Sequence, residues 1–171
     1  DIAVMTASAI APQSHAALQT GARKNRIDKP WRHLQTPTDG GALSDARPGD
    51  VIVLRGRAPW TDVGYGNRWA RFISQTGSQP TGKSGHGFLT IEAYPGEDVH
   101  YIAPPGTSGG IHGVGDGYEQ FADWIVIAGL HIESDAMSRS DGAPINLHAA
   151  SDHWRVVNNE LGPWPSRIDA K

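Results

Sequence analysis

Cysteine is absent from this 171-residue chain, which excludes disulfide bonds, zinc sites built on thiolates and cysteine nucleophiles. No run of about 18 apolar residues occurs either, so we expect no membrane-spanning helix. Charged residues are scarce, at 19% of the chain, and the net charge of −3 gives no electrostatic reason to expect a nucleic acid as partner. The lack of cysteine leaves the compartment open, because proteins can be secreted without disulfides.

Glycine and proline are abundant instead, with 21 and 12 residues. Their combined share lies well above the average of roughly 12%, which favours many tight turns and few helices. The chain is long enough for one domain with a real core. Residues 1–28 show no clear periodicity, and we expect them to form an N-terminal arm that is at most partly ordered.

The clearest pattern is a stretch at 123–132 that recurs without a gap at 152–161. Each copy consists of a short predicted strand, a corner and a second short strand, and a weaker copy lies at 87–94. The corners coincide at Gly129 and Asn158, residue types that accept the left-handed backbone of a sharp bend. Such a unit cannot bury an apolar face alone, so the repetition predicts units that stack on one another. Strands of a β-sandwich are the alternative at this point.

The remaining elements follow from apolar runs between turn residues. A short helix within 39–47 is stopped by Pro48. Residues 30–34 are predicted to form a first strand, with Trp31 capping one end of the core. Residues 57–86 look like a long loop, in which 69–72 are expected to form a helical turn. Further strands are expected at 51–54, 88–94, 99–102, 110–114 and 142–148.

Strand alternation assigns side chains to the inside or the outside of the stacked units. Matching 110–114 to 142–148 places His112 beside Asn146 on the outer face, with His148 on the same side. The same parity predicts other outward neighbours, namely the column Thr90, Val126 and Arg155 and the pair His131 and Glu160.

Asn159 follows the second of the matched corners. If its side chain points inward, the amide needs hydrogen-bond partners, which stacked backbones can supply.

Four segments, in this order, resemble the N-terminal half of the right-handed parallel β-helix proteins of the pectate-lyase-like superfamily: 30–34, 47–56, 89–97 and 123–132. The resemblance implies an all-β, right-handed parallel β-helix, a solenoid of about four to six coils with an N-terminal cap. It implies a domain over 29–171 that is secreted, extracellular or periplasmic and has a polysaccharide as its partner. Members of this superfamily usually continue for more coils, so a domain truncated at its C-terminal end, or one that self-associates there, is also considered.

Enzymes of this superfamily resemble one another in binding substrate along the outer face of one sheet, beside long loops. A lyase needs a base that removes the proton next to a uronate carboxylate, and a cation that stabilises the resulting charge. His148 and His112 are the candidate bases, and Arg155 is the candidate cation.

The substrate-binding candidates are polar or aromatic residues, the aromatic ones because they can stack on sugar rings: Asn146, Lys83, Trp60, Tyr65 and Trp69. The loop aspartates Asp116, Asp135 and Asp141 are hard oxygen ligands suited to Ca²⁺, the one cofactor considered.

Each assignment has a structural alternative. Outward polar residues are expected on any solvated sheet face, the loop aromatics can form a small core of their own, and aspartates favour turns. Asp135 and Asp141 would serve a glycoside hydrolase instead, if they flanked one bond.

The sequence therefore favours a polysaccharide lyase-like module that acts on an acidic glycan, with a hydrolase or a uronan epimerase as other enzyme classes. A non-catalytic structural or adhesion module that assembles through its open end is the alternative. The scaffold half of a longer enzyme is a third interpretation.

Overall fold

The computed structural model describes residues 2–6, 31–38, 40–56, 58–64, 68–73, 85–107, 109–114, 123–134, 143–147 and 152–164. Within them lie one short helix, α1 (Ala42–Asp45), and the following strands: β1 (Ile2–Thr6), β2 (Asp50–Leu54), β3 (Arg68–Ile73), β4 (Leu89–Ala93), β5 (Val99–Ala103), β6 (Gly109–Val114), β7 (Ile125–Ala128), β8 (Leu130–Ser134), β9 (Ala143–Leu147), β10 (Trp154–Val157) and β11 (Glu160–Leu161). The prediction of an all-β protein with very little helix is confirmed for this part of the chain.

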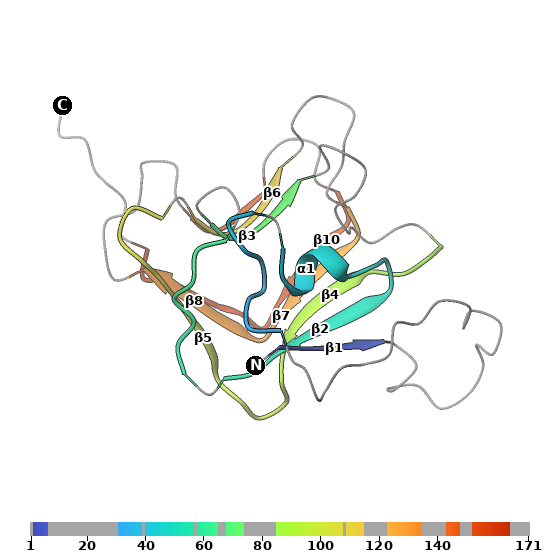
Figure 1. Ribbon diagram of the computed structural model, residues 1–171, viewed down its shortest axis with the longest axis horizontal. Helices are drawn as coiled ribbons and strands as arrows, with labels where there is room; N and C mark the ends of the chain where they lie inside the picture. The colour runs from blue at the N-terminus through green and yellow to red at the C-terminus, as the bar shows by residue number, and fades with distance from the viewer. Residues whose placement is uncertain are drawn as a thin grey trace.

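The strands form three sheets, with the orders β1-β2-β4-β7-β10, β11-β8-β5 and β3-β6-β9. Every pairing is parallel except that of β1 with β2. From β4 onward, consecutive strands lie in different sheets, and every third strand returns to the same sheet. Figure 1 shows the three sheets around a common interior. Parallel pairing excludes the β-sandwich alternative, since sandwich sheets are antiparallel.

The register of the repeated segments is the one that the sequence predicted. Ile125 pairs with both Leu89 and Trp154, and Ile127 pairs with both Ile91 and Val156. Residues that share a column therefore face the same side through successive strands. The stacking of the copies at 87–94, 123–132 and 152–161 is confirmed.

The corners also have the predicted backbone. Gly129 and Asn158 adopt φ values of 69° and 53°, in the left-handed region. Asn159 points inward, where its Oδ1 accepts a hydrogen bond from the Leu130 N–H at 2.9 Å and its Nδ2 donates one to the Ile127 carbonyl at 2.9 Å. The amide thus satisfies two backbone groups of the preceding unit, as the sequence predicted.

The core is built from inward columns of apolar side chains. Ile52, Ile91 and Ile127 form one column and have no exposed surface. Tyr101 and Ile132 form the corresponding column on β5 and β8 and are also fully buried. Side chains from all three sheets belong to this one cluster, so the interior between the sheets is the hydrophobic core of the described residues.

One end of the core is covered by residues 31–46. Figure 1 shows α1 across the opening between the sheets, and Leu34, Ala42 and Leu43 are fully buried there. The Gln35 side chain bonds both backbone groups of Arg71, accepting from its N–H at 2.7 Å and donating to its carbonyl at 3.1 Å. This amide closes the free edge of β3, which would otherwise expose unpaired backbone groups.

Two local predictions were wrong. Residues 31–34 form no strand, and the end of the core is covered by Leu34, whereas Trp31 is 38% exposed. Residues 68–73 form β3 and not a helical turn, because β6 and the Gln35 amide supply partners to its backbone. Within the predicted arm, β1 pairs with β2, since β2 offers a sheet edge there.

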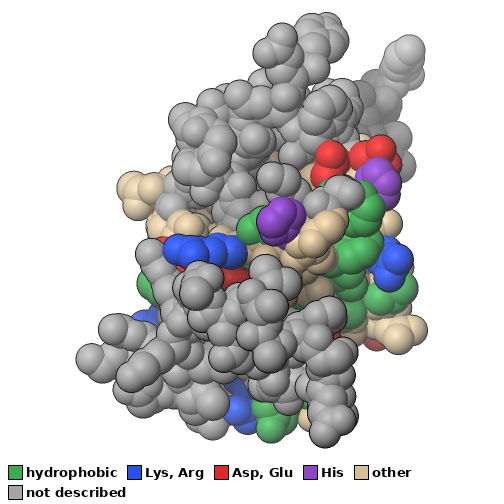
Figure 2. All heavy atoms as spheres, turned by 90° about the vertical axis from the view of Figure 1, so that its right-hand side faces the viewer, with side chains coloured by type: hydrophobic (Ala, Val, Ile, Leu, Met, Phe, Trp, Pro, Cys, Tyr) green, Lys and Arg blue, Asp and Glu red, His purple; other side chains and the backbone are tan. Residues whose placement is uncertain are grey.

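Figure 2 shows the side of the molecule that lies on the right in Figure 1. Acidic, basic and histidine side chains of the described residues lie there in small separate groups with hydrophobic ones between them. No helix in the described part has the length and the apolar character that are needed to cross a bilayer.

Candidate functional site

A row of polar side chains crosses the sheet β3-β6-β9. Arg71 pairs with His112, and His112 pairs with Asn146. The preceding row, Ala70, Ile111 and Ile145, belongs to the core or packs against it. Because side chains alternate between the two faces of a strand, the polar row lies on the outer face. The predicted neighbourhood of His112 and Asn146 is confirmed by this register.

The three residues of this row differ in their exposure to solvent. Arg71 and Asn146 are partly exposed, whereas His112 is 7% exposed. Arg71 and Asn146 are therefore the more accessible residues of the row. The sequence interpretation missed Arg71 because 69–72 were assigned to a helical turn. The two-residue alternation of Ala70 and Phe72, both fully buried, is the signal that would have placed Arg71 outside.

The pairing of β3 with β6 is interrupted two residues before the polar row. The hydrogen-bonded ladders pair Arg68 with Gly109 and Ala70 with Ile111 but omit Trp69 and Gly110 between them. A Cβ at Gly110 would lie 2.4 Å from the Pro144 carbonyl oxygen and 2.8 Å from Ile132 Cγ2. Only glycine fits at this contact. Opposite the interruption, the consecutive residues Trp69 and Ala70 are both fully buried, so the strand departs from strict alternation there.

Two of the predicted sugar-stacking residues belong to the interior. Trp69 is fully buried and stacks on Tyr101 with the ring centroids 4.4 Å apart, and Trp60 is 8% exposed and lies 6.1 Å from Trp69. The Trp60 indole donates to the Arg55 carbonyl at 3.0 Å. The structure thus matches the alternative in which these aromatics form a small core, and neither ring offers a face to a sugar.

Two acidic groups near this aromatic cluster have perturbed pKa values. Burial raises the pKa of the Tyr101 hydroxyl, and the charge of Asp62 raises it further, so this phenol stays neutral at any ordinary pH. Burial also raises the pKa of Asp62, partly offset by a contact of 3.3 Å between its Oδ2 and His33 Nδ1. Both shifts follow from packing at the covered end of the core.

The other predicted site residues lie on a different sheet or outside the residues that the structure describes. Arg155 stands on β10, in register with Val126 and Thr90 as predicted, with its guanidinium 4.4 Å from the Phe88 ring. It therefore belongs to a different sheet from His112 and Asn146, and the predicted groove is divided between two sheets. Outside the described residues lie His148, Lys83, Tyr65, Asp116, Asp135 and Asp141.

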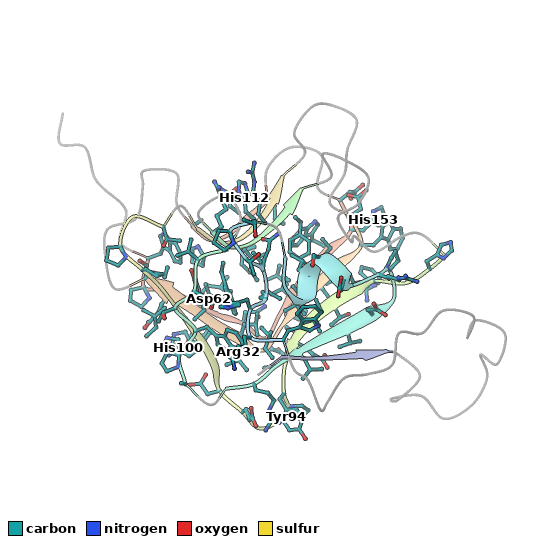
Figure 3. All side chains as sticks on the ribbon, in the orientation of Figure 1. Arg32, Asp62, Tyr94, His100, His112 and His153 are labelled. Carbon is teal, nitrogen blue, oxygen red and sulfur yellow. The ribbon has the colours of Figure 1, made fainter. Side chains whose placement is uncertain are left out.

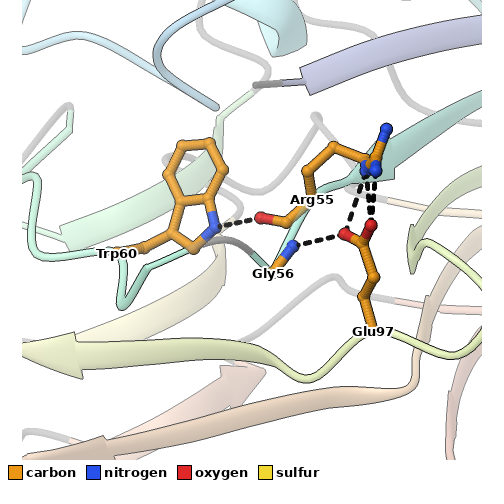
Figure 4. Close-up of polar contacts among 4 residues, drawn as sticks. All are labelled: Arg55, Gly56, Trp60 and Glu97. Atoms are coloured by element: carbon orange, nitrogen blue, oxygen red, sulfur yellow. Dashed lines mark hydrogen bonds and ion pairs between the residues drawn. The ribbon is translucent and has the colours of Figure 1, made fainter.

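A polar cluster fixes the corner between β4 and β5. Glu97 accepts hydrogen bonds from Arg55 Nε at 2.9 Å, from the Arg55 terminal nitrogen and from the Gly56 N–H at 2.8 Å (Figure 4). The Arg55 guanidinium also lies 4.2 Å from the centre of the Tyr94 ring. A Cβ at Gly56 would lie 1.9 Å from the Asp98 carbonyl oxygen. This corner is consequently held against the segment that follows β2.

Comparison with protein-family models, with curated proteins and with solved structures found no significant match to this chain. Statements about its function therefore depend on the sequence and on the geometry described above.

Proposed function

We propose that the chain is a right-handed parallel β-helix module that binds and processes an acidic glycan along the outer face of the sheet β3-β6-β9. The observation that carries the proposal is the row Arg71, His112 and Asn146, which places a cation, an imidazole and an amide side by side across three parallel strands. The return of every third strand to the same sheet supports the β-helix architecture.

The chemistry of the row suits a uronate-containing chain. Arg71 is the partner for the uronate carboxylate, since guanidinium and carboxylate can form paired hydrogen bonds. Asn146 can both donate to and accept from sugar hydroxyls. Neighbouring strands lie about 4.8 Å apart, so Arg71 and Asn146, with His112 between them, are separated by roughly 10 Å, and a glycan lying across the strands can contact both.

In the lyase reaction, a base takes the proton from the carbon beside the uronate carboxylate. A carbon–carbon double bond forms, the glycosidic carbon–oxygen bond breaks, and the leaving oxygen receives a proton. His112 is next to Arg71 but nearly buried, and His148 follows Asn146 by two residues on the predicted outer face. We propose His148 as the base and His112 as the residue that positions Asn146 and Arg71.

The test compares Arg71 on β3 with Arg155 on β10. Purified chain is incubated with a panel of acidic and neutral polysaccharides, with and without Ca²⁺, and unsaturated ends, reducing ends and binding are measured. Arg71→Ala should lower activity or binding at least tenfold in protein whose circular dichroism shows that it is folded; the Gln35 bonds involve only the Arg71 backbone and are kept.

Arg32→Ala, which removes an exposed charge at the covered end, is the control and should change neither quantity. A loss with Arg155→Ala but not with Arg71→Ala would move the site to the column of Thr90, Val126 and Arg155. Absence of binding to every acidic glycan, or equal activity in all variants, would refute the proposed function.

One observation favours the second candidate, a non-catalytic module that assembles through its open end. Val156 pairs with Ile127, and Leu161 pairs with Ile132, so both continue inward columns. Ile127 and Ile132 are fully buried, but Val156 is 41% exposed and Leu161 is 46% exposed. Exposed inward positions next to the strand edges of β10 and β11 suit pairing with a second copy of this chain. Sedimentation over a range of concentrations tests it: Val156→Lys should abolish any self-association, and a monomer at every concentration would rule this candidate out.

A further inference from the structure

Four potential metal ligands meet on the outer face of the sheet β5-β8-β11. Asp98 and His100 are two residues apart beside and within β5, and His131 and Glu133 are two residues apart within β8. The residues between them and next to them, Val99, Tyr101, Leu130 and Ile132, are buried in the core. Strand alternation therefore directs all four polar side chains to the outside.

Register brings the two pairs together. His100 pairs with His131, and their rings stack in parallel with the centroids 3.9 Å apart. The Nε2 atom of His100 lies 3.0 Å from one oxygen of Glu133, and the Nε2 atom of His131 lies 3.5 Å from the other. The potential ligand atoms of Asp98, His100 and His131 all lie within 4.8 Å of one another.

These spacings bring the donor atoms within reach of one ion, and one imidazole turns out of the parallel stack when both nitrogens face that ion. Two atoms bound to a tetrahedral zinc ion at about 2.1 Å lie about 3.4 Å apart, and the two imidazole-to-carboxylate distances of 3.0 and 3.5 Å lie on either side of that value. His100 Nε2 thus faces the Glu133 carboxylate in the metal-free chain.

We propose that Asp98, His100, His131 and Glu133 bind a divalent transition-metal ion of the zinc class. Two imidazoles with carboxylates form a donor set that suits such ions better than Ca²⁺ or Mg²⁺, which take oxygen ligands. The side chains of His100, His131 and Glu133 are each 20 to 22% exposed, so an ion can enter from solvent.

The scaffold fixes the backbone that carries these residues before any ion binds. The bonds from Arg55 and Gly56 to Glu97 fix the corner that carries Asp98, and the parallel pairing of β5 with β8 fixes the spacing of the two histidines. An ion bound here would join neighbouring strands of the sheet and thereby stabilise the stack. Figure 3 shows His100 on β5 and His112 on β6 on different sides of the molecule, so this inference is independent of the proposed glycan site.

The test uses untagged, metal-free protein and Zn²⁺ followed by calorimetry, with Co²⁺ as a spectroscopic probe. We expect one ion per chain, the intense visible absorption of four-coordinate Co²⁺, and a rise in melting temperature of roughly 5 °C or more at a hundredfold excess over Kd. His100→Gln and Glu133→Gln should each weaken Zn²⁺ binding at least tenfold. His86→Gln, at an exposed histidine in the turn before β4, is the matched control and should bind like the unmutated chain.

Should a variant fail to fold, nitrogen NMR of the histidine rings in the unmutated chain decides the matter. Of the eight histidines, two should shift on addition of one equivalent of Zn²⁺. Absence of stoichiometric binding, a Co²⁺ spectrum of the hexa-aquo ion, or equal affinity in His100→Gln and His86→Gln would overturn the assignment and leave the cluster as an ion pair between Glu133 and the histidines.

Discussion

Replacing Asn159 with alanine tests the physical basis of the stacked corners. The substitution removes the acceptor of the Leu130 N–H and the donor to the Ile127 carbonyl, both partly buried bonds of 2.9 Å. A hydrogen bond contributes about 0.5–1.5 kcal/mol net, so the two together predict a loss of about 1–3 kcal/mol. For a domain of this size, that corresponds to a fall in melting temperature of roughly 3–10 °C. Urea denaturation followed by circular dichroism measures the free energy directly.

The neighbouring residue supplies the control. Asn158 is exposed and adopts φ 53°, a conformation that glycine takes freely. Asn158→Gly should therefore change stability by less than about 0.5 kcal/mol, although it alters the same corner. Equal stability of Asn159→Ala and the unmutated chain would show that backbone groups at this corner find other partners, and would refute the reasoning about the side-chain amide.

Two further substitutions probe the interior. Gly110→Ala should destabilise by about 2 kcal/mol or more, because its Cβ would lie 2.4 Å from a carbonyl oxygen. Gly109→Ala should cost less, because the nearest atom to its Cβ would be 3.2 Å away. Similar denaturation midpoints for these two variants would contradict the close contact at Gly110. Asp62→Asn should stabilise the protein at pH 7, because burial raises the pKa of Asp62 above 3.8 in the folded state. The folded state thus loses stability as the pH rises from that value, and the advantage of the Asp62→Asn variant over the unmutated chain should vanish below about pH 4. A less stable variant at pH 7 would mean that the His33 contact outweighs burial.

Much of the fold was predictable because the interior repeats. Ile125, Ile127 and their partners in 152–161 must occupy equivalent positions, and the register they imply is the one found. Gly129 and Asn158 were recognisable since a sharp bend restricts the residue types that fit. Trp69 was misplaced because it and the next residue, Ala70, are both buried, which departs from the alternation that Ala70 and Phe72 follow. A pattern of period two cannot reveal where a strand departs from that period.

The candidate sites were harder to predict, for a related reason. Inward positions are restricted by packing, so Ile91 or Ile132 can be inferred from neighbours, whereas outward positions accept almost any residue and must be located through the register. His112 and Asn146 were paired because their strands have similar sequences. The predicted pair of His131 and Glu160 is found, but the pairing of His100 with His131 was missed because a four-residue turn at 95–98 replaces the single-residue corner at Gly129, which hides the equivalence of the following strands.

Inward and outward columns of the stacked strands differ in how strongly packing restricts their residues. An inward column is kept apolar by burial, and an outward column on a parallel sheet needs no particular residue to stay folded. His100 and His131 stack at 3.9 Å, and their Nε2 atoms lie 3.0 and 3.5 Å from the Glu133 carboxylate, although the packing of the sheet requires a histidine at neither position. Zn²⁺ titration of the unmutated chain beside His100→Gln therefore tests whether this pair binds an ion or only packs.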